Sequence, residues 1–131
     1  MKKILLLFLV TFIFAFIVIP HAYAAKAKVV DITASASVSK NKREVIAYFG
    51  NLQNARSVSF TLIYETNGQQ EGAGGSVKIT KGLKNVSRSI LLGTCSKKVC
   101  RYHTKIKNMQ LIISGKLTNG KSFSKTLKIK Y

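Results

Sequence analysis

Acidic and histidine side chains are scarce in this chain of 131 residues. Acid–base catalysis needs paired carboxylates, and nucleophilic catalysis needs a histidine that an acid orients beside an activated serine or cysteine. No acid lies within twenty residues of His103, which is expected to be an ordinary half-exposed side chain. We therefore expect no enzyme activity and no small-molecule substrate. Against 22 Lys and Arg, the chain has four acids: Asp31, Glu44, Glu65 and Glu71.

A long apolar run occurs once, at residues 4–19. Two lysines precede it, and Pro20 and the tripeptide Ala-Tyr-Ala at residues 22–24 follow, which is typical of a secretory signal peptide. We expect residues 1–24 to form a signal helix that is removed, leaving one domain of residues 25–131 that is secreted, periplasmic or at the cell surface. The run approaches the roughly 20 residues that cross a bilayer, so an uncleaved N-terminal membrane anchor is the alternative.

Cysteine is nearly absent, and the two present, Cys95 and Cys100, have four residues between them. In an oxidising compartment such a pair predicts a disulfide, which stabilises a ring this short by only about 2 kcal/mol. A zinc site would add His103, but three ligands fall short of the four of a closed structural site. A redox pair lacks the C-x-x-C spacing, although basic neighbours would lower a thiol pKa. We expect a structural disulfide, with no metal and no cofactor.

Negative charge remains scarce after export. Only two of the basic residues leave with the signal segment and none of the acids does, so 20 Lys and Arg face four acids and the net charge is +16. Charges of one sign at this density repel one another. The domain should therefore be stabilised by added salt or by polyanions.

Apolar residues after residue 24 alternate with polar ones. In the segment 57–66, Val58, Phe60, Leu62 and Tyr64 share one parity and all but one residue of the other parity are polar, as in a strand with one face on a core. No apolar stripe of period 3.6 persists, which disfavours helix. The alternation predicts seven strands, at about residues 30–38, 45–49, 57–66, 77–79, 86–92, 109–117 and 123–131.

Two glycine-containing segments are interpreted as connections between strands. Asn119-Gly120 lies between alternating segments and predicts a hairpin with a type I′ turn. The stretch NGQQEGAGGS, residues 67–76, lacks the ending and the following helix of a phosphate-binding loop, so we expect a long mobile loop. Lys125 falls on the inward parity of the last strand and predicts a bulge or an exposed edge.

Seven short strands without a helix predict an all-β fold, an antiparallel sandwich. In this pattern the domain resembles the immunoglobulin and fibronectin type III class. The resemblance implies a seven-stranded sandwich with its turns gathered at two ends. It does not extend to antibody domains, because tryptophan is absent and the cysteines are too close to bridge two sheets.

Basic residues gather in the predicted turns. In an immunoglobulin-like order the first turn, the cysteine segment and the glycine stretch lie at the same end, which predicts one basic pole, whereas Lys81 and Lys84 belong to another turn. An equally simple interpretation is a solvated surface. The predicted anion-binding residues are Lys40, Lys42, Arg43, Lys97, Lys98, Arg101, Lys105 and Lys107.

An exported basic domain meets anionic envelope polymers and lipid surfaces first. Nucleic acid is disfavoured, because Tyr102 is the only aromatic residue within the basic segments and base stacking needs more. The sequence thus predicts a non-catalytic module that binds anionic envelope or extracellular polymers. The alternative is a structural subunit that pairs with a protein partner through an exposed edge strand, for which the last strand is the candidate.

Overall fold

The computed structural model describes residues 31–97 and 99–131; the predicted signal helix at residues 1–24 and Lys98 lie outside this part. The predicted all-β class is confirmed: apart from one 3-10 helix, η1 (Leu52–Asn54), the elements of the described residues are strands, and their pairs are antiparallel. No helix in these residues has the length and apolarity for crossing a membrane. The strands are β1 (Thr33–Val38), β2 (Glu44–Gly50), β3 (Ala55–Thr66), β4 (Gln69–Val77), β5 (Val86–Leu91), β6 (Gly93–Ser96), β7 (Val99–Tyr102), β8 (Lys107–Leu117) and β9 (Ser122–Lys128).

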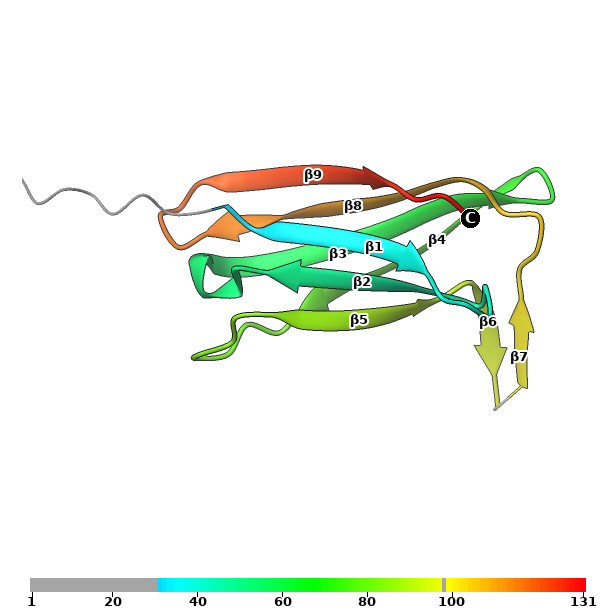
Figure 1. Ribbon diagram of the computed structural model, residues 1–131, viewed down its shortest axis with the longest axis horizontal. Helices are drawn as coiled ribbons and strands as arrows, with labels where there is room; N and C mark the ends of the chain where they lie inside the picture. Colours follow the sequence, from blue (N-terminus) through cyan, green and yellow to red (C-terminus); the bar gives the residue numbers. More distant parts are fainter. Residues whose placement is uncertain (1–30, 98) are drawn as a thin grey trace, which may run out of the picture.

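The strands form three antiparallel sheets (Figure 1). One has the order β1-β2-β5, the second has the order β4-β3-β8-β9, and β6 pairs only with β7. The described residues therefore hold nine strands, of which seven belong to the two larger sheets. The predicted count of seven strands is therefore not confirmed. Two strands, β6 and β7, come from the cysteine segment, which was predicted to be a turn, and the strand predicted at about residues 77–79 overlaps β4 only at Val77.

The two larger sheets share one apolar core, an arrangement consistent with a β-sandwich. Inward residues of β2 and of β3 meet there, and the rings of Phe49 and Phe60 lie 5.5 Å apart between their centroids. Burial of each large apolar side chain contributes about 1.5–3 kcal/mol. This core fixes which residues face solvent and brings the turns together at the two ends. The largest fully buried side chains are Phe49, Ile32, Leu52, Leu62, Leu92, Leu111, Ile113, Val45 and Val58.

The glycine-rich stretch 67–76 is not a loop, contrary to the prediction. Asn67 and Gly68 both have positive φ and form a two-residue turn, as type I′ requires. The residues that follow pair with β3 along the whole of β4. Glycines have no side chain and so show no alternation, but the ring of Phe60 covers Gly75 on the neighbouring strand.

The predicted hairpin at Asn119-Gly120 is present, but its turn is of another type. Gly120 has a φ of 85°, whereas Asn119 is not among the residues with positive φ. Lys125 lies on the edge strand β9 in regular register with β8, so it does not mark a bulge. Its ammonium crosses to the start of β1, where it is 3.1 Å from Asp31 and donates to the carbonyl of Ile32.

Gly115 on β8 lies where a side chain would collide with both neighbouring strands. A Cβ there would lie 2.0 Å from the Ser57 carbonyl oxygen and 2.9 Å from the Phe123 ring. We expect Gly115→Ala to lower the free energy of unfolding by about 2 kcal/mol or more, measured by urea denaturation. Gly74→Ala is the control, because its Cβ would come no closer than 3.3 Å to any atom. Equal losses in the two variants would contradict the close approach.

Candidate functional site

Seven of the eight predicted anion-binding residues lie in the described part of the chain, at one end of the two sheets (Figure 1). The β1–β2 turn, the β3–β4 turn, the β6–β7 hairpin and the segment between β7 and β8 all lie at this end. We call this region the basic end. All seven of its predicted residues are exposed. They are Lys40, Lys42, Arg43, Lys97, Arg101, Lys105 and Lys107.

Backbone hydrogen bonds tie the first turn to the base of the hairpin. The amide of Leu92 donates to the carbonyl of Arg43 at 2.8 Å, and the amide of His103 donates to the carbonyl of Leu92 at 2.9 Å. The guanidinium of Arg43 lies 4.6 Å from the centroid of the Tyr102 ring, within the range of a cation–π interaction. Two basic segments far apart in the sequence are thus held together.

The end of the chain contacts the same turn. The ammonium of Lys42 lies 5.1 Å from the centroid of the Tyr131 ring, and the Tyr131 hydroxyl is 3.4 Å from the Lys42 carbonyl oxygen. The anion-binding residues predicted from the sequence do not include Tyr131, and the contact between Arg43 and Tyr102 was not predicted. Only the position of Tyr102 inside a basic segment could have drawn attention to it.

The segment after β7 is attached to β3. The hydroxyl of Tyr64 lies 3.0 Å from Nδ1 of His103, and the Thr66 hydroxyl donates to the carbonyl of Thr104 at 2.7 Å. Burial raises the pKa of Tyr64, and the nearby charge of Glu71 raises it further, so this hydroxyl stays protonated near neutral pH and can donate to the imidazole. His103 is half-buried, as expected. These contacts place Lys105 and Lys107 beside the end of β3.

Three lysines of the basic end have a left-handed backbone conformation. Lys42 has a φ of 57°, Lys97 of 46° and Lys105 of 52°. This conformation costs a residue with a Cβ about 1–2 kcal/mol, and glycine or asparagine adopts it more readily. Asparagine does occupy the other three left-handed non-glycine positions in the described residues, at Asn51, Asn67 and Asn108. Lysine is therefore not the residue that backbone geometry favours at these turns.

The acidic residues at the basic end form no salt bridge with the cations that the structure describes there. Glu44 accepts a hydrogen bond from Ser89, and Glu65 lines a hollow of about 220 Å³ with Asn67, Gly68, Lys105 and Lys107. In the described part of the chain, the only salt bridge is the one between Lys125 and Asp31, on the opposite side of the fold. The seven described cations of the basic end therefore form no salt bridge and can contact an anion.

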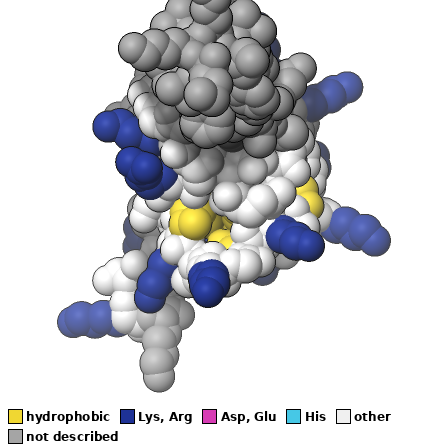
Figure 2. All heavy atoms as spheres, turned by 90° about the vertical axis from the view of Figure 1, so that its left-hand side faces the viewer, with side chains coloured by type: hydrophobic (Ala, Val, Ile, Leu, Met, Phe, Trp, Pro, Cys, Tyr) yellow, Lys and Arg dark blue, Asp and Glu magenta, His cyan; other side chains and the backbone are white. Residues whose placement is uncertain are grey.

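The opposite end is also basic, contrary to the predicted single pole (Figure 2). Lys and Arg side chains project around the rim of this face, with small apolar areas between them. Lys81 and Lys84 lie in the connection from β4 to β5, and Lys121 lies in the β8–β9 turn. Positive charge alone therefore does not distinguish the basic end. The basic end is distinguished by its left-handed lysines, Lys42, Lys97 and Lys105.

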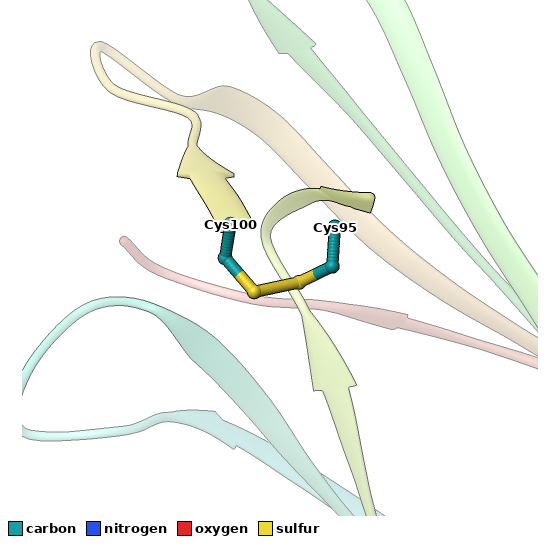
Figure 3. The surroundings of a disulfide bond; sticks show 2 residues. All are labelled: Cys95 and Cys100. Carbon is teal, nitrogen blue, oxygen red and sulfur yellow. A yellow bond between two sulfur atoms is a disulfide. The ribbon is translucent and has the colours of Figure 1, made fainter. Parts of the chain in front are cut away.

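The predicted disulfide is confirmed (Figure 3). Cys95 and Cys100 are directly opposite each other in the hairpin, with an S–S distance of 2.08 Å and a Cα–Cα distance of 4.1 Å.

In the residues that the structure describes, no group of three or more His, Cys, Asp or Glu side chains could hold a metal ion. Comparison with protein-family models, curated proteins and solved structures finds no match to this chain.

Replacing Lys105 tests the cost of the left-handed lysines. We expect Lys105→Asn to raise the free energy of unfolding by about 0.5–1 kcal/mol, because asparagine tolerates this conformation better. Lys107→Asn is the matched control: it removes the same charge two residues further on, in a strand, where asparagine gains nothing. Thermal or urea unfolding measures both. An equal gain in stability in the control would show that loss of the positive charge, and not relief of the backbone, causes the effect.

Proposed function

We propose that this chain is an exported, non-catalytic β-sandwich module that binds anionic cell-envelope or extracellular polymers through its basic end. The N-terminal pattern of residues 1–24 supports export. The strand orders β1-β2-β5 and β4-β3-β8-β9 support an immunoglobulin or fibronectin III-like topology, with the β6–β7 hairpin as an addition between β5 and β8. The scarcity of acids and histidines supports a binding role over catalysis.

The left-handed lysines carry the proposal. At Lys42, Lys97 and Lys105 the chain keeps a cation where glycine or asparagine would relieve the backbone. Unfavourable conformations of this kind cluster at functional sites, because the surrounding structure offsets their cost. All three lie at one end of the sheets, with Lys97 at the tip of the hairpin that projects from it, so an extended polyanion could contact them together. A purely solubilising surface would not need its charges at these positions.

Removing lysines from one end or the other distinguishes binding at the basic end from a diffuse electrostatic attraction to the whole surface. The exported chain is titrated with polygalacturonate and, separately, with vesicles of phosphatidylglycerol and phosphatidylcholine, at low and high salt. Affinity should fall steeply as salt rises, because contacts between exposed charges are screened. We expect the triple variant Lys42→Asn, Lys97→Asn, Lys105→Asn to bind polygalacturonate at least tenfold more weakly than the unmodified chain.

The control triple variant is Lys81→Asn, Lys84→Asn, Lys121→Asn, which removes the same charge from the opposite end. We expect its affinity to fall less than threefold. Equal losses in the two triples would show a diffuse electrostatic attraction and overturn the assignment to the basic end. Affinity that does not change with salt would overturn the proposal altogether.

A second candidate function is assembly through an edge strand, and β4 favours it. The sequence interpretation assigned this role to the last strand, but β9 carries Lys125 and Lys128, and charges on edges oppose pairing. The nine residues of β4 form the edge on the other side of the same sheet; they include one charged residue, Glu71, against two lysines in β9, and no Lys, Arg or Pro. A second chain could add a strand there.

Sedimentation velocity over a range of concentrations tests assembly. If β4 pairs with another chain, larger species should form as concentration rises, and Ser76→Lys should suppress them, because a lysine on the edge opposes pairing with a second cationic chain. Ser124→Lys is the matched control on β9, since both serines are exposed and belong to one cross-strand row through Ser59 and Ser114. A monomer at every concentration would eliminate this candidate.

A further inference from the structure

The β6–β7 hairpin takes no part in the core. It forms a sheet of its own and projects from the basic end (Figure 1). Its described side chains from Thr94 to Tyr102 are all exposed, and Val99 has 68% of its surface in contact with solvent. An exposed apolar side chain on a projecting element contributes nothing to the burial that stabilises the domain. The exposed side chains of the hairpin therefore contribute little to the stability of the core and are accessible to a ligand.

Several contacts hold the hairpin in one shape. At its tip the disulfide joins Cys95 to Cys100 (Figure 3). At its base the strands approach so closely that a Cβ on Gly93 would lie 2.2 Å from the Arg101 carbonyl oxygen. The stacking of Arg43 on Tyr102 braces the same base from the first turn. A binding element ordered in advance loses little conformational entropy when a ligand arrives.

The two faces of the hairpin differ in chemistry. Because side chains alternate along a strand, the disulfide and Tyr102 share one face. The other face carries two cross-strand pairs, Thr94 with Arg101 and Ser96 with Val99. These four exposed side chains border an open hollow of about 360 Å³ on the surface of the hairpin.

The lining of this hollow matches a singly charged ligand with polar and apolar parts. The guanidinium of Arg101 offers a planar fork that fits a carboxylate by two parallel hydrogen bonds. The hydroxyls of Thr94 and Ser96 can donate to or accept from ring hydroxyls. Val99 offers an apolar wall for the C–H face of a ring. A multiply charged phosphate would instead be matched by several cations and no apolar wall.

We infer that this face of the hairpin is the specificity site of the basic end and takes a carboxylated sugar unit of an anionic polysaccharide. This inference rests on the proposed function: the turns attract the polymer, and the hollow selects among polyanions. Selection among polyanions then depends on whether Cys95 and Cys100 are oxidised to the disulfide. Reduction would free the two strands at the tip, so that ordering them costs binding energy while the core of the domain stays intact.

Two probes of equal charge test this inference: oligogalacturonate and oligophosphate, each titrated calorimetrically against the exported chain. We expect oligogalacturonate to bind at least tenfold more tightly at physiological salt. Arg101→Lys keeps the charge but loses the fork, so it should weaken oligogalacturonate at least fivefold and leave oligophosphate within twofold. Arg88→Lys makes the same exchange on β5, away from the hairpin, and should change neither affinity.

Two further variants keep the test independent of charge. Val99→Ser should weaken oligogalacturonate about threefold. The double variant Cys95→Ser, Cys100→Ser should weaken it at least threefold while the circular dichroism spectrum stays that of the unmodified chain. Equal binding of both probes, or no greater loss in Arg101→Lys than in Arg88→Lys, would overturn the hairpin site and leave salt-dependent polyanion binding standing. Failure of both probes to bind would overturn the proposed function with it.

Discussion

The apolar layer between the two larger sheets is the constraint on which the rest of the structure depends. A chain with 22 basic residues and four acids repels itself when it becomes compact, and the burial of side chains such as Phe49 and Phe60 must offset that repulsion. The alternation that fills this layer also sends every second side chain outward. Those outward residues are largely serine and threonine in the strand centres, so most of the charge lies near the turns.

Charge at the turns explains why the two ends resemble each other in sign. They differ in how the backbone is held. At the opposite end, Lys125 is paired with Asp31 and joins the last strand to the start of the first. At the basic end, aromatic rings contact Lys42 and Arg43, and the cations that the structure describes there form no salt bridge. Exposed cations that form no salt bridge, on turns that other contacts hold in place, can bind an external anion.

The strands whose one face is apolar could be predicted from the sequence, because periodicity reports burial directly. The prediction failed at β4, where Gly72, Gly74 and Gly75 carry no side chain to alternate, and the decisive signal was the turn dipeptide Asn67-Gly68. The β6–β7 hairpin was missed as strand because both of its faces are exposed. Alternation reports a strand only where one face is buried.

For the candidate site, the sequence supplied the residue types and the disulfide but not the contacts. The first turn and the cysteine segment lie at the same end because of the strand order. The resemblance to the immunoglobulin and fibronectin type III class was enough to predict this. The stacking of Arg43 on Tyr102 and the contact of Lys42 with Tyr131 depend on tertiary distances. The left-handed lysines were unpredictable, since lysine is not favoured in that conformation.

The position of Asp31 has a consequence for orientation. The described chain begins beside the β8–β9 strands, and β1 then runs for six residues, about 20 Å, before it reaches the turn that holds Lys42. Because Asp31 precedes β1, the chain enters the domain at the end of the sheets opposite the β6–β7 hairpin. The length of β1 therefore separates the point of entry from the turns that carry the basic end, and leaves those turns uncovered by the entering segment at Asp31.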